Sequence, residues 1–189
     1  CIIGGSKIST KINVITNLIE KVNCIIIVGA MANSFFVHKN LKIGKSLAEK
    51  ETKEIIESIY KKAKKNDCKI LIPEDCMVGI SFEGKGKNKN LNDIQDDEII
   101  LDIGVNTIKK ICEEIDQSNT VLWNGPAGYF ENDNFANGTL SIAKNISKNT
   151  VKKSLISVIG GGDTLAAINK SKSKLSFSHL STAGGAFLE

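Results

Sequence analysis

Short runs of continuous apolar, mostly β-branched residues alternate along this chain with longer amphipathic stretches. Apolar runs of this kind suit strands that are buried on both faces of a parallel sheet. They span residues 24–28, 69–72, 99–101, 120–123 and 155–159. Apolar side chains recur at helical spacing within residues 12–22, 51–65, 105–115 and 135–146. Strand–helix alternation is typical of βαβ units, and it predicts a doubly wound α/β sheet.

We expect a single domain, since 189 residues lie close to the ~150 residues of one domain and neither a linker nor a repeat divides the chain. No run approaches the ~20 apolar residues of a membrane-spanning helix, so no membrane partner is expected. The first residues lack a basic leader and a long apolar run, which argues against a signal peptide. They also lack an initial methionine, which indicates a fragment or a processed piece.

Arginine is absent from the chain, so all 25 cationic residues are lysines. The planar fork that clamps phosphate in two hydrogen bonds belongs to arginine, so its absence weakens a nucleic-acid or phosphate-fork hypothesis. A net charge of +4, spread along the chain, is not the footprint of a nucleic-acid-binding protein either. We therefore expect no nucleic-acid partner.

The five cysteines are odd in number and show no CxxC spacing. Cys24, Cys68 and Cys112 lie inside apolar runs, which predicts buried, reduced thiols and a cytoplasmic protein. Only His38 and His179 could join a Cys/His metal site, and neither stands near a cysteine in sequence.

One segment interrupts the alternation of strands and helices, because residues 84–90 are basic and residues 92–98 are acidic. We expect a solvated surface loop there.

Turns rich in glycine or acidic residues follow the predicted strands. They lie at residues 4–5, 29–30, 73–75, 102–104, 124–128, 160–164 and 184–185. Because parallel strands point one way, we expect these turns to gather at the carboxyl edge of the sheet, where open α/β sheets bind ligands. Glycine permits close approach of backbone to a ligand, and the amides at helix starts favour anions. Any one such turn needs glycine anyway, but the full set favours a nucleotide or phosphate ligand.

The standard nucleotide and hydrolase motifs are absent. No GxxxxGK[ST] segment is present, which excludes a P-loop, and no GxGxxG follows a strand. A GxSxG elbow is also missing.

The roles of three charged residues stay open at this point. Asp163 is either the N-cap of a helix over residues 164–169 or a Mg²⁺ ligand beside a phosphate. Lys7 and Lys11, one helical turn apart, are either solvated or reach over one phosphate chain.

Four segments together resemble the phosphoglycerate kinase family. GGSKISTKI at residues 4–12 resembles that family's GGAKVxDKI, and WNGPAGYFE at residues 123–131 resembles WNGPxGxFE. IGGGDT at residues 159–164 has the family's form, and SHLSTAGGA at residues 178–186 resembles SHxSTGGGA. The order and spacing agree from end to end, so the resemblance covers essentially the whole chain.

The resemblance implies that residues 1–189 form the carboxyl-terminal, nucleotide-binding domain, without the amino-terminal phosphoglycerate-binding domain and the final carboxyl-terminal segment. The implied fold is a Rossmann-like, doubly wound three-layer sandwich with a mainly parallel central sheet. The implied activity is glycolytic: a phosphoryl group moves between 1,3-bisphosphoglycerate and Mg·ADP, giving 3-phosphoglycerate and ATP. Mg²⁺ and ADP or ATP would bind here, the phosphoglycerate would bind through the absent domain, and the protein would be a monomer. The isolated chain would then be inactive as a kinase.

The resemblance also implies roles at the phosphates. Lys7 would stabilise the transferring phosphoryl group, assisted by the backbone of Gly161 and Gly184. Lys11 would bind the nucleotide phosphates, and Asp163 would be the metal ligand. Further phosphate contacts are implied for Gly162 and Thr164, and the amide of Gly185, like that of Gly184, would lie near the transferring group.

Other residues are implied to hold the nucleoside. Glu131 would accept hydrogen bonds from the ribose hydroxyls, and Asn124 and Pro126 would line the phosphate and ribose side. Gly29 and Leu101 would form part of an adenine slot. The cofactor-binding set is completed by Gly5, Ser6, Ile100, Gly128 and Tyr129.

Two other functions compete with this one. Departures from the family pattern at Thr10, Ile100 and Ala183 suggest a degenerate α/β module that binds a nucleotide without catalysis. A nicotinamide-dependent dehydrogenase is suggested only by the fold class, and the glycine fingerprint that it needs is missing.

Overall fold

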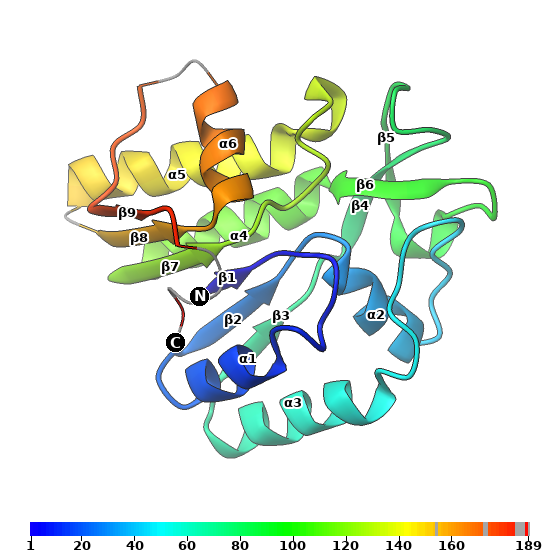
Figure 1. The fold of residues 1–189 in the computed structure, drawn as a ribbon, viewed down its shortest axis with the longest axis horizontal. Helices are drawn as coiled ribbons and strands as arrows, with labels where there is room; N and C mark the ends of the chain where they lie inside the picture. Colours follow the sequence, from blue (N-terminus) through cyan, green and yellow to red (C-terminus); the bar gives the residue numbers. More distant parts are fainter. Residues whose placement is uncertain (154, 172–173, 184–187, 189) are drawn as a thin grey trace.

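Strands and helices alternate along the chain in the computed structural model, which describes residues 1–153, 155–171, 174–183 and 188 (Figure 1). The strands are β1 (Ile2–Ile3), β2 (Cys24–Ile27), β3 (Lys69–Leu71), β4 (Asp75–Gly79), β5 (Lys87–Asn90), β6 (Ile99–Ile103), β7 (Thr120–Asn124), β8 (Ile156–Gly160) and β9 (His179–Ser181). The helices are α1 (Ile12–Ile19), α2 (Met31–His38), α3 (Lys53–Lys65), α4 (Val105–Gln117), α5 (Asn137–Lys153) and α6 (Gly162–Lys170). Two 3₁₀ turns, η1 (Leu91–Asp93) and η2 (Asp133–Phe135), complete the described elements.

The main sheet has six strands in the order β3-β2-β1-β7-β8-β9, and every pairing in it is parallel. The chain winds outward from β1 to β3, returns to β7 beside β1, and winds outward again. The strand order therefore reverses between β1 and β7, as in a Rossmann-like fold. The predicted doubly wound α/β fold with a mainly parallel central sheet is confirmed.

Two hydrophobic cores lie on the two faces of this sheet. Ile3 faces the core built with α1, α2 and α3, whereas the neighbouring Ile2 faces the core built with α4 and α5. β2 alternates in the same way, with Ile25 in the first core and Ile26 in the second. Figure 1 shows α1 and α3 on one side of the sheet and α4, α5 and α6 on the other. The continuous apolar runs thus reflect burial on both faces.

The run at residues 99–101 does not join the parallel sheet. It is part of β6, which pairs antiparallel with β4 in a separate sheet of order β5-β4-β6. Residues 80–86 connect β4 to β5, which is too short for a parallel crossover, so these two strands pair antiparallel and β6 pairs with the other edge of β4. The prediction that this run and its turn belong to the parallel sheet is wrong.

The predicted surface loop at residues 84–98 is also wrong in part, because residues 87–90 form β5. β5 is an edge strand whose lysine and asparagine side chains are mostly exposed, a composition that protects sheet edges from further pairing. The basic and acidic parts of this segment also interact with each other through an ion pair. The Nζ atom of Lys89 lies 2.7 Å from a carboxylate oxygen of Glu98, and both side chains are largely buried.

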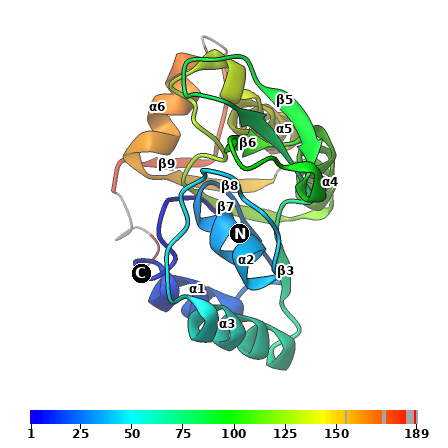
Figure 2. The ribbon, with the colours of Figure 1, turned by 90° about the vertical axis from the view of Figure 1, so that its right-hand side faces the viewer.

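Asp75 connects the small sheet to α4, which lies near it in Figure 2. One carboxylate oxygen accepts a hydrogen bond from the Thr107 amide at 2.8 Å, and the other accepts one from the Asn106 amide at 3.0 Å. Burial alone would raise the pKa of Asp75, but these hydrogen bonds and that from the Thr107 hydroxyl lower it overall. A Cβ atom at Gly104 would lie 2.2 Å from the Asp75 carboxyl carbon, so the helix entry needs glycine there. The cap of α4 is thus supplied by a strand distant in sequence.

All five cysteines are free, and Cys68 and Cys76 are buried. Burial raises the pKa of the Cys76 thiol to about 12, which keeps it protonated and unreactive at neutral pH. Of the three cysteines predicted to be buried, Cys68 is buried, whereas Cys24 and Cys112 are only partly buried. Within the described ranges, none of the helices is apolar over a stretch long enough to traverse a membrane.

Candidate nucleotide site

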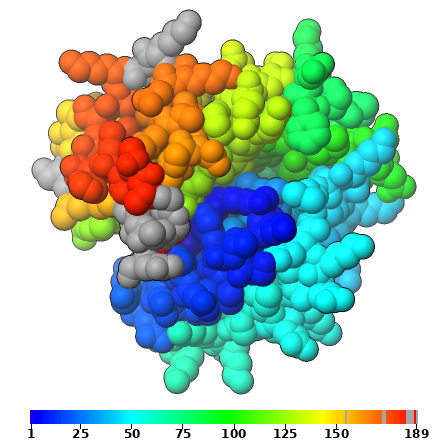
Figure 3. Space-filling view, in the orientation of Figure 1, coloured from blue at the N-terminus to red at the C-terminus, as the bar shows by residue number. Residues whose placement is uncertain are grey.

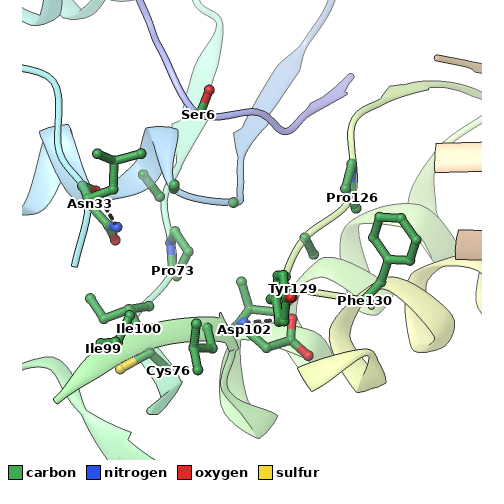
Figure 4. Close-up of a pocket in the computed structure, with 18 of the residues that line it drawn as sticks. Ser6, Asn33, Pro73, Cys76, Ile99, Ile100, Asp102, Pro126, Tyr129 and Phe130 are labelled. Carbon is green, nitrogen blue, oxygen red and sulfur yellow. Dashed lines mark hydrogen bonds between the residues drawn. The ribbon is translucent and has the colours of Figure 1, made fainter. Parts of the chain in front are cut away.

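A cavity of about 350 Å³ lies where the carboxyl ends of β1, β2 and β7 face the small sheet. In the space-filling view the surface is hollowed where the blue amino-terminal segment meets the yellow-green segment after β7 (Figure 3). Much of the wall is apolar, and it is lined by β4 and β6 of the small sheet together with α2 and the turns after β1, β3 and β7 (Figure 4). The cavity therefore lies beside the switch point between β1 and β7, where doubly wound folds bind their ligands.

Many of the predicted site residues line this cavity, although they are far apart in sequence. They are Gly5, Ser6, Gly29, Ile100, Leu101, Pro126, Gly128, Tyr129, Glu131 and Asp163. The structure thus brings together residues from four separate turns and from β6. Gly184 and Gly185 lie outside the described residues.

Glycines let the turns after β1, β2 and β7 pack against one another. Gly29 has a φ of +70°, and a Cβ atom on it would lie 3.1 Å from the Gly5 amide nitrogen. Gly125 has a φ of +98°, and its Cβ atom would lie 2.4 Å from the carbonyl oxygen of Gly4. Both conformations are left-handed and both spaces are filled by backbone, so larger side chains do not fit. This contact fixes the floor of the site.

Lys11 directs its ammonium group to the ends of β1 and β7. Its Nζ atom donates hydrogen bonds to the Gly4 carbonyl oxygen at 2.8 Å and to Asn124 Oδ1 at 2.7 Å. Burial lowers the pKa of Lys11, and the charge of Asp163 opposes that effect. An ammonium group has three N–H donors, and these two acceptors use two of them among the described residues. One donor therefore remains for a ligand.

Lys7 is placed differently from the prediction. Lys11 directly precedes α1, and Lys7 lies in the turn before it, so the two are not one helical turn apart. The Lys7 side chain is exposed and does not line the cavity. The turn is closed by the Thr10 hydroxyl, which donates to the Lys7 carbonyl oxygen at 2.9 Å.

Asp163 lies in the first turn of α6, with its side chain exposed at the cavity wall. The N-cap of α6 is Gly161, whose φ is +96°, so of the two alternatives for Asp163 the N-cap role is wrong. A Cβ atom on Gly161 would approach the Asn124 amide to 3.0 Å, which explains why the chain turns here on glycine. The carboxylate is consequently left to face the opening.

Thr164 links α6 to the turn after β7. Its hydroxyl oxygen accepts a hydrogen bond from the Gly125 amide at 2.7 Å, and the residue is fully buried. The hydroxyl therefore positions two glycine turns relative to each other, and the residues presented to solvent at this point are Gly162 and Asp163.

The opposite wall is formed by residues 126–131 against β6. The Tyr129 amide donates to the Leu101 carbonyl oxygen at 2.7 Å, and the Tyr129 ring packs edge-on against Phe82 with centroids 5.0 Å apart. Lys170 of α6 donates to the Glu131 carbonyl oxygen at 2.7 Å. These contacts hold Glu131 at the rim, with its side chain exposed.

Asp102 is a cavity-lining carboxylate that the sequence interpretation did not single out as a site residue. It is 3% exposed, and its oxygens accept hydrogen bonds from the Gly138 amide at 2.7 Å and the Ile103 amide at 2.9 Å. Burial raises the pKa of Asp102 to about 7, and these hydrogen bonds oppose that rise only in part. The signal that could have identified it is an isolated acidic residue within an apolar strand.

We expect Asp102 to make stability fall as the pH rises. Its pKa is about 7 in the folded chain, against an ordinary aspartate value of 3.8, so the folded chain binds the proton more tightly than the unfolded chain does. Stability is thus lost between about pH 4 and pH 7, at about 1.4 kcal/mol per unit of pKa difference and a few kcal/mol in total. Denaturation from pH 5 to 8 should show a flatter stability profile for Asp102→Asn than for the unmodified chain. The exposed Asp97→Asn is the control, and parallel profiles for all three proteins would contradict the assignment.

No group of three or more His, Cys, Asp or Glu side chains that could hold a metal occurs among the described residues. Asp163 therefore belongs to no such group. This arrangement fits Mg²⁺ only together with a nucleotide, since Mg²⁺ is commonly held by one or two carboxylates together with substrate phosphates and water.

The strand order, the switch-point cavity and the glycine turns define a doubly wound α/β domain of the class that binds ligands at the carboxyl edge of its sheet. A model of the phosphoglycerate kinase family matches residues 1–189. The chain belongs to the phosphoglycerate kinase family, which confirms the resemblance of its four motif segments.

Individual relatives agree over the whole chain. The phosphoglycerate kinases of Zymomonas mobilis and Chelativorans are 43% and 41% identical to it over 190 residues. Among solved structures, phosphoglycerate kinase from Coxiella burnetii superimposes with a TM-score of 0.91 at 39% identity, covering 99% of this chain and 48% of that one. The enzyme from Pyrococcus horikoshii gives a TM-score of 0.78 at 28% identity, covering 99% and 47%. The chain spans about half the length of the curated relatives it matches. It covers 48% of the Chelativorans protein and 48% of the Zymomonas mobilis protein.

Proposed function

We propose that residues 1–189 are the nucleotide-binding domain of a glycolytic phosphotransferase, which moves a phosphoryl group between 1,3-bisphosphoglycerate and Mg·ADP. The observation that carries the proposal is the cavity at the switch point, with a half-buried ammonium group and an exposed carboxylate at the same sheet edge. The phosphoglycerate substrates would bind through a second domain. The free cysteines fit a reducing compartment such as the cytoplasm, and we propose a monomer.

Phosphoryl transfer depends mainly on positioning and charge neutralisation rather than on covalent chemistry by the protein. Lys11 supplies a cation that two acceptors hold in place, and its remaining N–H is available to a phosphate oxygen. The backbone amides of Gly161 and Gly162, at the start of α6, suit the same phosphates. The side chain of Lys7, exposed beside this edge, would reach the transferring phosphoryl group. We propose that the backbone of Gly184 also contacts this group.

Mg²⁺, when bound with the nucleotide, would neutralise phosphate charge, and Asp163 is the residue that would hold it. The exposed position of Asp163 at the cavity wall supports this assignment. Asn124 holds Lys11 and lies against Gly161, and it therefore orders the phosphate side of the site.

The nucleoside would occupy the apolar part of the cavity. Gly29 and Leu101 leave room for a flat ring between the two sheets, and Ile100 and Tyr129 add apolar surface. Glu131, exposed at the rim, would accept hydrogen bonds from ribose hydroxyls. Gly5, Ser6, Pro126 and Gly128 complete the wall toward the phosphates.

We expect Mg·ADP to bind the 189-residue chain in titration calorimetry, whereas Mg²⁺ alone gives no measurable heat. Asp163→Asn should weaken Mg·ADP binding by roughly tenfold, because the loss of one contact by an exposed charged group costs about 1.5 kcal/mol, the lower end of the range for such contacts. It should leave the binding of ADP with EDTA almost unchanged. The exposed Asp97→Asn carries the same charge change and serves as the control. Absence of heat with millimolar Mg·ADP would overturn the proposed site.

A further inference from the structure

The loop between β4 and β5, residues 80–86, is held by two asparagine side chains from another part of the chain. Asn132, the N-cap of η2, donates through its side-chain nitrogen to the Phe82 carbonyl oxygen at 2.8 Å. The same nitrogen lies 3.5 Å from the Gly84 carbonyl oxygen, to which the Asn134 side chain also donates at 3.3 Å. The Asn132 side-chain oxygen accepts hydrogen bonds from the backbone and side-chain nitrogens of Asn134 at 2.9 and 3.0 Å. The orientation of the Asn132 amide is therefore fixed.

The loop does little to hold itself in place. Its internal backbone hydrogen bond, from the Gly84 amide to the Ser81 carbonyl oxygen, is long at 3.5 Å. Phe82 is 49% exposed, so packing secures its ring only in part. Because the 2.8 Å bond from Asn132 acts on the carbonyl group of Phe82 itself, it is the contact that fixes the backbone from which this ring projects.

Phe82 forms an aromatic wall together with Tyr129. Their ring centroids lie 5.0 Å apart in the edge-to-face arrangement that aromatic pairs prefer. Both residues line the cavity, and both also line a neighbouring hollow that contains Glu83 and Asp133. The pair therefore separates the apolar slot from a polar, more open surface. Asn132 lines that hollow but not the cavity, so it can act on the cavity only through the aromatic wall.

We propose that Asn132 is a positioning residue, which holds the Phe82 carbonyl group and so keeps the aromatic wall in place for a nucleoside to pack against. This inference rests on the proposed function and deepens it. The wall offers apolar surface and no hydrogen bond to a base, so it favours burial of the nucleoside without selecting one base over another. Asn132 itself lies outside the cavity and contacts no ligand atom.

Asn132→Ser tests the proposal on the 189-residue chain. Serine is as good a cap as asparagine and carries no charge, but its hydroxyl group is too short to replace the bond to Phe82. We expect the affinity for Mg·ADP in titration calorimetry to fall roughly fivefold, the effect of one hydrogen bond or one aromatic contact. Asn137→Ser is the control, because Asn137 is exposed at the start of α5 and outside the cavity. It should bind Mg·ADP normally.

A double-mutant cycle with Phe82→Ala distinguishes positioning from a general loss of structure. Phe82→Ala alone should also weaken Mg·ADP binding roughly fivefold. Adding Asn132→Ser should then cost less than about twofold more, because no ring remains to be positioned. A thermal melt verifies the fold of each variant. If Asn132→Ser does not fold, Asn132→Asp takes its place, since it keeps the acceptor for the Asn134 amide and removes the donor to Phe82.

Two results would refute the role of Asn132 and leave the proposed function intact. One is an unchanged affinity for Mg·ADP in either single variant. The other is a full additive loss in the double variant, which would show that Asn132 does not act through Phe82. No binding of Mg·ADP to the unmodified chain would overturn both the inference and the proposed function.

Discussion

Replacing Lys11 by methionine should weaken the binding of Mg·ADP by roughly 10- to 100-fold, because a hydrogen bond to a charged group contributes about 1.5–3 kcal/mol. The side chain of Lys11 is partly buried and already aimed by Gly4 and Asn124, so little ordering is needed when a phosphate arrives. Exposed lysines lack this advantage, since they lose rotamer freedom on binding. The loss should therefore be larger for Lys11 than for any exposed lysine at the rim.

Titration calorimetry on the folded variant measures this loss, with a thermal melt to verify the fold. Methionine keeps most of the length of the lysine side chain and removes its charge. The fold should tolerate the change, since burial already opposes the charged form of Lys11 and lowers its pKa. Lys144→Met, at an exposed position of α5, makes the same change of net charge away from the cavity and should bind Mg·ADP normally. Equal weakening in both variants would show that net charge, rather than the placement of Lys11, determines affinity.

The sequence allowed the parallel sheet to be predicted because its strands carry local evidence. Burial on both faces makes residues 24–28 continuously apolar, and the helical segments repeat at helical spacing. The same local evidence could not place β6, since a strand buried in either sheet looks apolar. It pairs with β4, a strand that the sequence did not indicate, and only the folded chain reveals this partner. β4 and α2 were not predicted at all.

The candidate site also contains residues that the sequence identified and residues that only the folded chain reveals. Residues within the four motif segments were identified from their resemblance, and the fold brings those that line the cavity to one sheet edge. Asp102 was not identified as a site residue, because it is a single acidic residue at the end of an apolar run. What makes it notable is its burial and its hydrogen bond from Gly138, which depend on the packing of β6 against α5. Such information is not local in the sequence.

The second large effect concerns stability: Gly125→Ala should destabilise the chain by about 2–6 kcal/mol, a large part of the 5–15 kcal/mol of a typical domain. The backbone φ of +98° is strained for alanine. Its Cβ atom would also lie 2.4 Å from the Gly4 carbonyl oxygen and 2.5 Å from the carbonyl carbon. These are backbone atoms at the end of β1, so no side-chain rotation relieves the clash. The turns after β1 and β7 would have to separate.

A thermal melt should show this as a decrease in Tm of roughly 5–20 °C, at about 2–4 °C for each kcal/mol in a domain of this size. Gly162→Ala is the matched control, because a Cβ atom there meets nothing within 4 Å and the residue is helical. Alanine favours the helix over glycine, so the control should be neutral or more stable by up to ~1 kcal/mol. Equal Tm values for Gly125→Ala and the unmodified chain would mean that the two turns can move apart freely. The close contact between β1 and β7 would then not fix the floor of the nucleotide site.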